Sequence, residues 1–395
     1  DFHLIVLSRQ PPAWSLGRLR LQDRLLEVGV TDLRFTREEI ATYLDHSAGL
    51  ALPGDMLTRL QKQTEGWAAG LQLAALTLRQ QHGAQTLLGE EGGLSGFVGS
   101  DNRYLLEYMV DEVLADLPAG LLDFMYATSI CARFSVELCQ VLAGVDRETA
   151  RSYLRTLQEA DLFLLPLDAG REGNGGPAQG ERRTWYRYHH LMQQTLARRL
   201  QDSANAETIV ELHRRAATWL GDQGYVDEAL DHLAQIGDWD AAAYLVARQL
   251  NALLNREDRR TIERWLAIFP AEEIGRRPAL VLMGVWSCFF NLDTAGMVQN
   301  LAALSAAAAA LSNEAGADAA SATPRAWLPE FEGHRILLQG VAAYFGGQLE
   351  ATIAAAQQAI TLVPRANAFV HSSAYFYLLT AMQIVGQGDE AEALA

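Results

Sequence analysis

A change of hydrophobic period between residues 184 and 200 is the most informative local pattern in this chain. From Thr184 to His189 aromatic and polar residues alternate, which predicts a half-buried strand. From His190 onward apolar residues recur at helical spacing, which predicts a helix. Arginines occupy its last turn, where positive side chains interact favourably with the negative end of the helix dipole. The pattern therefore predicts a strand that runs directly into a helix, with two adjacent histidines at the joint.

The residues before this joint predict the rest of a small domain. An apolar run begins at Phe163, and a glycine-rich stretch follows at residues 170–183. Helical patterns at residues 135–142 and 148–159 come earlier. Helices followed by strand, loop, strand and helix are typical of a winged helix with its wing in the glycine-rich loop. We expect this winged-helix domain to span residues 100–207.

Residues 31–99 carry the pattern of a helical domain. Thr36 and Glu39 have the spacing of a capping box, which predicts a helix from there to about His46. Further helical patterns cover residues 54–63 and 66–81. Residues 83–100 are rich in glycine and predict a loop.

Two short apolar runs near the start of the chain, at residues 3–7 and 25–30, predict buried strands. Two strands cannot bury themselves without further partners. We therefore expect residues 1–30 to be the C-terminal part of an α/β nucleotide-binding domain.

From about residue 208 the pattern becomes repetitive. Small residues and helix starts recur near Gly224, Gly346 and Gly386, and the last two segments superpose at an offset of 40. This period predicts an α-solenoid of the tetratricopeptide type over residues 208–395. Aromatic residues in it are interpreted as repeat core, with an inducer groove as the alternative: Trp286, Phe289, Phe290, Tyr344, Phe345, Tyr375, Phe376 and Tyr377. The expected fold class is thus mainly α.

Charge and composition narrow the function. The 395 residues carry a formal net charge of −16 with scattered basic residues, so we do not expect a bare nucleic-acid-binding domain. Three cysteines without metal spacing predict buried thiols in a reducing cytoplasm. The sequence contains no run of eighteen apolar residues, so we do not predict a membrane-spanning helix. Lys62 is the only lysine, so no phosphate-binding GxxxxGK[ST] motif exists in this chain.

Six segments, in a fixed order over residues 1–250, resemble the ATP-dependent transcriptional activators of the maltose-activator (MalT) type. These proteins are signal-transduction NTPases of the STAND class with a LuxR-type helix-turn-helix. The segments are LIVLSRQPP, GRLRLQDRLLEVGVTDLRFTREE, TEGWAAGLQLAALTLR, RYLLEYMVDEVLADLP, WYRYHHLMQQTLARRL and LHRRAATWLGDQGYVDEALDHLAQIGDWDAAAYLV. The resemblance implies a nucleotide-binding α/β domain, a helical domain, a winged helix and a superhelical sensor array, and this chain would be the central fragment of such a protein.

The resemblance also implies nucleotide-binding residues. Arg9 matches the sensor arginine that would approach the γ-phosphate, and a guanidinium suits phosphate oxygens. His189 matches the winged-helix histidine that would touch the β-phosphate of ADP, with His190 in place of the usual acid. Gly66, Trp67 and Ala68 match a helix start that contacts the base. The alternatives are a surface arginine, a packed histidine at a strand end, and a glycine that lets Trp67 pack.

The resemblance implies that this chain is the regulatory part of a cytoplasmic switch that is biased by ATP and ADP. An inducer or regulatory protein would bind the repeats, activation would permit self-association, and DNA would be bound by a C-terminal domain outside this fragment. We expect no catalysis by this chain alone, while the full-length protein would be a slow ATPase. The alternative is a helical-repeat scaffold for protein partners without any nucleotide role. The sequence contains neither an HExxH nor a GxSxG motif, so we do not expect an isolated hydrolase.

Overall fold

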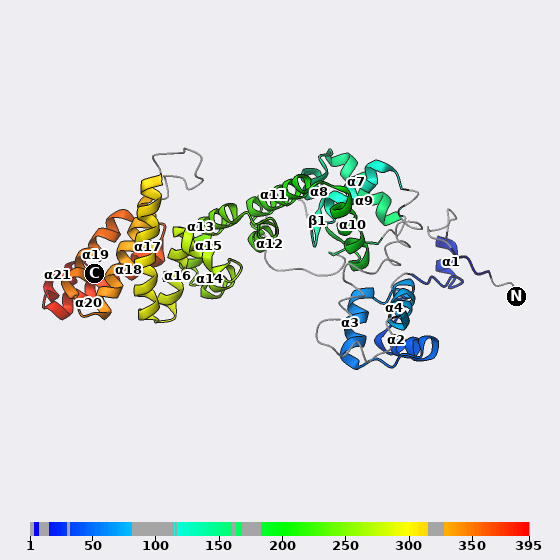
Figure 1. Cartoon of the computed structure of the whole chain (residues 1–395), viewed down its shortest axis with the longest axis horizontal. Coiled ribbons are helices and arrows are strands. Elements are labelled where there is room, and N and C mark those ends of the chain that lie inside the picture. Colours follow the sequence, from blue (N-terminus) through cyan, green and yellow to red (C-terminus); the bar gives the residue numbers. More distant parts are fainter. Residues whose placement is uncertain are drawn as a thin grey trace. The chain divides into compact units, whose positions relative to one another are not determined.

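The computed structural model describes residues 4–7, 16–29, 32–80, 114, 117–159, 163–167, 183–314 and 328–394. The chain divides into two compact units, Asp1–Ala216 and Ala217–Ala395 (Figure 1). The predicted domain limits at residues 30, 99 and 207 remain predictions.

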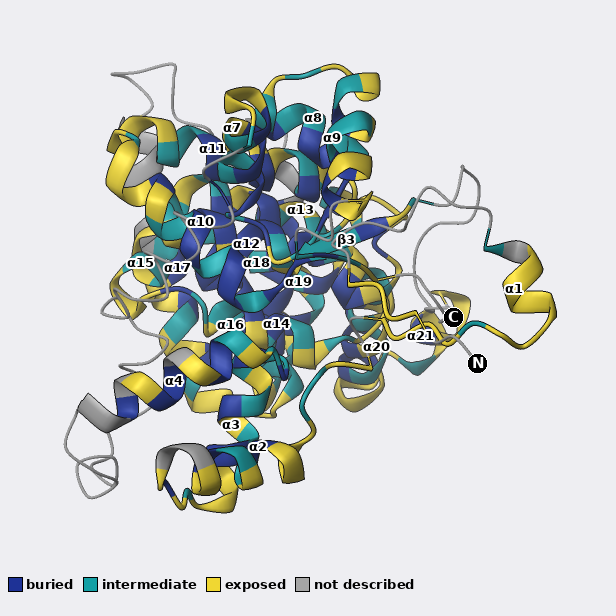
Figure 2. Ribbon diagram, turned by 90° about the vertical axis from the view of Figure 1, so that its right-hand side faces the viewer, coloured by how far each residue is buried: buried dark blue, intermediate teal, exposed yellow. Residues whose placement is uncertain are grey.

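The two strands predicted near the start of the chain are not formed. Residues 4–7 and 25–29 have no regular secondary structure, and among the described residues between them, 16–24, α1 (Gly17–Leu21) is the one regular element. Their apolar side chains face solvent, with Ile5 at 86%, Leu7 at 95% and Leu26 at 87% exposure. Figure 2 shows α1 itself mostly exposed. The prediction was wrong because an apolar run becomes a strand only when other strands supply its hydrogen bonds.

The helical segment that follows was predicted closely. It comprises α2 (Arg37–Tyr43), a π-helical turn η1 (Leu44–Ala48), α3 (Gly54–Thr64) and α4 (Ala68–Gln80). Thr36 and Glu39 form the expected capping box, which satisfies N–H groups at the start of α2. A cluster of buried side chains from all four elements forms the core: Ile40, Leu44, Leu50, Met56, Leu57, Leu60, Leu71, Ala74, Ala75 and Leu78. The loop predicted at residues 83–100 lies outside the described residues.

The winged helix is present as predicted. Its elements are α7 (Ala119–Thr128), β1 (Phe134–Ser135), α8 (Val136–Ala143), α9 (Arg147–Glu159), β2 (Leu164–Pro166), β3 (Trp185–Tyr188) and α10 (His190–Ser203). The strands form an antiparallel sheet in the order β1-β3-β2. Most of the predicted wing, at residues 168–182, lies outside the described residues, and β2 and β3 pair on either side of it.

The central strand β3 is packed from both faces rather than from one. Trp185 and Tyr188 are buried, and the two residues between them are half-buried. The Tyr188 ring packs against Phe134, and its hydroxyl lies 2.8 Å from the hydroxyl oxygen of Thr128 on α7. This contact fixes the strand against the helices, and with it the position of His189 at its end.

The second unit is helical throughout its described residues. It begins within α11 (Ala206–Asp222) and continues with α12 (Val226–Ile236), α13 (Trp239–Asn255), α14 (Arg259–Leu266), α15 (Ala271–Arg276), α16 (Pro278–Phe290), α17 (Thr294–Glu314), α18 (Leu328–Phe345), α19 (Leu349–Leu362), α20 (Ala368–Val385) and α21 (Gly388–Leu394). Successive helices from α16 to α21 pack against one another (Figure 1). This is the predicted tetratricopeptide-like solenoid.

Glycines mark the turns of the repeat, as the sequence predicts. Gly224, Gly347 and Gly386 each adopt a left-handed conformation between two helices, with φ of 83°, 75° and 94°. The left-handed residue in the second of these turns is Gly347 and not its neighbour Gly346. The left-handed glycines of the last two turns, Gly347 and Gly386, are therefore 39 residues apart, against the predicted offset of 40.

The aromatic residues of the repeats divide between core and surface: Trp286 and Tyr377 are buried, and Phe289, Phe290 and Tyr344 are half-buried. Trp286 is fully buried, stacks edge-on with Phe289 and Phe369, and donates a hydrogen bond to Nδ1 of His334 over 3.1 Å. Phe345, Tyr375 and Phe376 are exposed, so the preferred core interpretation holds only in part. The helix α20 is long and apolar enough to span a membrane by composition. Six of its residues are nevertheless buried in the protein: Val370, Ala374, Tyr377, Leu378, Ala381 and Met382.

The close approach of α18 and α19 yields a prediction about stability. A Cβ at Gly340 would lie 2.8 Å from the Cβ of Ala355, whereas a Cβ at Gly275 would meet nothing within 4 Å. We expect Gly340→Ala to destabilise the protein by about 1–3 kcal/mol because the helices must separate. The matched Gly275→Ala should be neutral or stabilising by up to about 1 kcal/mol, since alanine favours helix. Urea unfolding measures both, and equal effects would contradict the packing argument.

Candidate functional site

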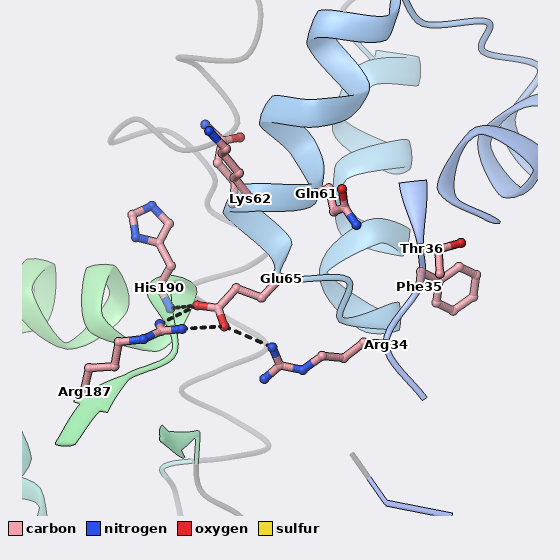
Figure 3. Close-up of a pocket in the computed structure, with 9 residues that line it drawn as sticks. Arg34, Phe35, Thr36, Gln61, Lys62, Glu65, Arg187 and His190 are labelled. Carbon is pink, nitrogen blue, oxygen red and sulfur yellow. Dashed lines mark hydrogen bonds and ion pairs between the residues drawn. The ribbon is translucent and has the colours of Figure 1, made fainter. Parts of the chain in front are cut away.

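The candidate site is organised around Glu65, which lies at the end of α3. Glu65 is in the left-handed conformation, with φ of 47°, and so is Gly66, with φ of 72°. This turn ends the helix and directs the Glu65 side chain toward β3 and the start of α10 (Figure 3). The side chain is only 11% exposed.

Three groups from two parts of the chain meet the Glu65 carboxylate. Arg187 on β3 donates two hydrogen bonds, over 2.7 and 3.1 Å, in the fork geometry that suits guanidinium and carboxylate. The backbone N–H of His190, the first residue of α10, donates over 3.2 Å. Arg34 donates from the other side over 3.3 Å. One carboxylate therefore connects residue 34, the end of α3 and the strand-helix joint.

The electrostatics agree with a charged Glu65. Burial alone would raise its pKa, but the hydrogen bonds from Arg187 and the N–H of His190, together with the neighbouring positive charge, lower the pKa to about 2. The carboxylate is therefore ionised at neutral pH. With two arginines on one carboxylate, this part of the site keeps a net positive charge.

His189 is buried next to this cluster. Its residue exposure is 4%, and its ring packs edge-on against Trp67 and Phe163 at centroid distances of 6.4 and 5.8 Å. Burial lowers the pKa of His189 to about 4, although the Glu65 carboxylate, 3.9 Å from Nε2, acts to raise it. The imidazole is therefore neutral at pH 7, and its contact with Glu65 is not an ion pair there.

An open groove of about 690 Å³ lies beside the Glu65 cluster. Figure 3 shows residues of α3 on one side of it and the strand-helix joint on the other. Its lining is Arg34, Phe35, Thr36, Gln61, Lys62, Gln63, Glu65, Arg187 and His190. Three basic side chains, Arg34, Lys62 and Arg187, against one carboxylate make the groove suited to an anion of phosphate type.

The structure brings some predicted site residues together. Trp67 and His189, separated by 122 positions, are in contact. Gly66 is required for packing, because a Cβ there would lie 2.6 Å from the carbonyl oxygen of Phe35. The N–H groups of Gly66 and Trp67 already donate to Thr64, over 3.3 and 2.8 Å. These two groups are therefore not available to an anion, and Arg9 lies outside the described residues.

Sequence reasoning missed the residues that line the groove. Arg187 shares a face of β3 with His189 by period-2 alternation, so this signal was present. His190 lines the groove while His189 does not, although the resemblance favours His189. Glu65 and Arg34 gave no local signal, because their significance depends on contacts with residues more than thirty positions away.

No group of three or more histidine, cysteine or acidic side chains able to hold a metal is found in the described parts of the chain. Cys131 and Cys139 are buried, as predicted, and Cys288 is partly buried. Burial raises the pKa of the Cys139 thiol well above its usual value.

Comparison with known proteins identifies the class to which this arrangement belongs. Residues 110–208 match the MalT winged helix domain. The chain is 32% identical over 284 residues to the serine/threonine-protein kinase PknK of Mycobacterium tuberculosis. This alignment covers 72% of the present chain and 24% of PknK. It is 29% identical over 284 residues to the HTH-type transcriptional regulator MalT of Klebsiella pneumoniae, which covers 72% of this chain and 29% of MalT.

A solved structure of a STAND protein with a tetratricopeptide repeat sensor, from Pyrococcus horikoshii, was also found. Its alignment covers 91% of this chain and 58% of the Pyrococcus chain. Its sequence identity is 12% and its TM-score is 0.27. The chain spans about a quarter of the length of the curated relatives it matches. Its winged helix is of the MalT type. The predicted resemblance is confirmed over the matched part of the chain: it is similar to MalT and contains a MalT-type winged helix.

Histidine burial predicts a pH dependence of stability. In the folded state the pKa of His189 is about 4, against an ordinary value of 6.5, so between these values the unfolded chain binds the extra proton. Stability should therefore fall as pH falls from about 6.5 to about 4. His189→Phe, which keeps an aromatic ring, should show a shallower fall in urea unfolding. His46→Gln changes an exposed histidine of the same unit and serves as control; equal slopes for wild type and His189→Phe would contradict the assignment.

The Glu65 cluster predicts a measurable coupling energy. Glu65→Gln should destabilise the first unit by about 1–3 kcal/mol, because Arg187 and Arg34 lose a charged acceptor in a half-buried position. A double-mutant cycle with Arg187→Gln should give a coupling of about 1 kcal/mol or more. The pair Arg20 and Glu27 has a similar geometry but is exposed, so its cycle should give almost none. Equal coupling in both cycles would contradict a special role for Glu65.

Proposed function

We propose that this chain is the central regulatory part of a cytoplasmic transcription regulator that is switched by ATP and ADP. In the resting state ADP lies at the junction between α3–α4 and β3–α10, with its phosphates beside the cationic groove and His189. The nucleotide-binding domain supplies the remaining contacts, including Arg9. Release of ADP in favour of ATP separates the two sides of the junction and permits self-association.

The observation that supports this proposal is the composition of the junction. It is held by a charged cluster around Glu65 and is flanked by an open groove with Arg34, Lys62 and Arg187. A junction held by a few charge-assisted hydrogen bonds has a small free-energy difference between closed and open states. A phosphate ligand beside it is therefore able to bias that equilibrium.

The other assignments follow the MalT-like resemblance. The repeats of the second unit would bind an inducer or a regulatory protein, and a C-terminal domain outside these 395 residues would bind DNA. The chain contains no Walker lysine, because its single lysine, Lys62, lies in α3. Hydrolysis of ATP is therefore assigned to the full-length protein and not to this part.

A second candidate is a helical-repeat scaffold for protein partners without a nucleotide role. The exposed aromatics Phe345 and Phe376 on α18 and α20 favour it, since exposed aromatic side chains are enriched at protein interfaces.

Nucleotide analysis of the full-length protein tests the proposal. We expect ADP to be released when the purified protein is denatured. His189→Ala and Arg187→Gln should each weaken ADP binding by about tenfold, equivalent to about 1.4 kcal/mol, and raise activity in the absence of inducer. Arg198→Gln changes an arginine of α10 that does not line the groove and serves as control. Absence of adenine nucleotide, with no ADP binding by calorimetry, would leave the scaffold as the function.

A further inference from the structure

A second cationic surface lies on the winged helix, apart from the Glu65 groove. It is a pocket of about 350 Å³ between α8, α9 and the start of β3. Its lining includes four arginines, Arg147, Arg151, Arg155 and Arg183, and a single carboxylate, Glu137. Three of these arginines recur every four residues within one segment, and the fold adds Arg183 to them, in a chain whose net charge is −16.

The backbone beneath this surface is a helix-turn-helix. The helix α8 ends at Gly144, which is left-handed with φ of 66°, and α9 begins three residues later. Asp146 caps α9 by accepting hydrogen bonds from the N–H and hydroxyl of Thr149, over 2.8 and 3.0 Å. A three-residue turn with glycine is typical of this motif, in which the second helix is the one presented to DNA.

The arginines form a stripe along that second helix. Arg147, Arg151 and Arg155 are spaced by four residues, and all three are exposed. The opposite face of α9 is buried through Ala150, Leu154 and Leu157. The helix is therefore held by its apolar face and presents its cations to solvent. Its two acidic residues lie outside the lining of the pocket.

Ion pairs define which of these charges are available. Glu137 lies 3.3 Å from Arg147 and 3.4 Å from Arg183, and these neighbours help to lower its pKa against the effect of burial. This pairing fixes both arginines at the edge of the pocket. No ion pair with a described carboxylate is found for Arg151 or Arg155. Arg183 lies two residues before β3.

We propose that the winged helix contacts the phosphate backbone of double-stranded DNA through Arg151 and Arg155 of α9, with Arg147 and Arg183 at the edge of the contact. Guanidinium groups on an exposed helix-turn-helix second helix bind phosphate oxygens and position a protein on the duplex without reading its sequence. This contact adds a second attachment point to the DNA-binding domain assigned above, and it does not depend on the nucleotide switch.

Fluorescence anisotropy with this 395-residue chain and a fluorescein-labelled 30-base-pair duplex of mixed sequence tests the proposal. We expect binding at 50 mM NaCl that weakens steeply at 200 mM. Arg151→Ala/Arg155→Ala should bind at least tenfold more weakly at 50 mM, and its slope of log Kd against log salt should be smaller by about two. Both side chains are exposed, so circular dichroism should show an unchanged fold.

Two further variants make the result specific. Arg151→Lys/Arg155→Lys keeps the charges and should retain most of the affinity. Arg214→Ala/Arg215→Ala removes the same charge from exposed positions on α11 and should bind as wild type does. The proposal is overturned if wild type does not bind at 50 mM, if the α9 and α11 alanine variants bind equally, or if polyglutamate competes as well as unlabelled duplex. The last result would indicate an acidic protein partner instead.

Discussion

The first unit depends on a single carboxylate that is shared between two parts of the chain. Glu65 leaves α3 through a left-handed turn and accepts hydrogen bonds from Arg187, Arg34 and the N–H of His190. Burial of a carboxylate is costly unless its lone pairs are satisfied by donors. The oxygens of Glu65 have all of these donors only when the helical segment and the winged helix are in contact. The buried charge of Glu65 therefore couples the two segments to each other.

The neighbouring apolar contacts follow from the same arrangement. Gly66 allows residue 35 to pass close to the chain, and Trp67 then lies against His189 and Phe163. The imidazole is neutral in this setting, so it contributes packing and a polar atom rather than a charge. Two residues of the predicted nucleotide site, Trp67 and His189, are thus in contact. The positive charge of the site comes from the basic side chains that line the groove beside them.

Local patterns predicted most of the elements and fewer of the contacts. The change of period at residue 189, the capping box at Thr36 and the glycines between repeat helices each depend on neighbours in sequence, so the sequence revealed them. The strands predicted before residue 31 failed because strand formation depends on partners elsewhere. The same limitation concealed Glu65: a glutamate at a helix end has no distinctive pattern until residue 187 is placed beside it. The arginines of α9 recur every four residues, which places them on one helix face, but only the fold shows that this face is exposed and that Arg183 lies beside it.

Hydrogen–deuterium exchange at the strand-helix joint tests the central claim most directly. The amide of His190 donates to Glu65, so its exchange reports whether the carboxylate holds the start of α10. In Glu65→Ala, exchange at residues 188–193 and at residues 64–67 should become at least tenfold faster, with the repeat helices of the second unit unchanged. Equal protection of these segments in wild type and variant would contradict the account, because the junction would then be held by its apolar contacts alone.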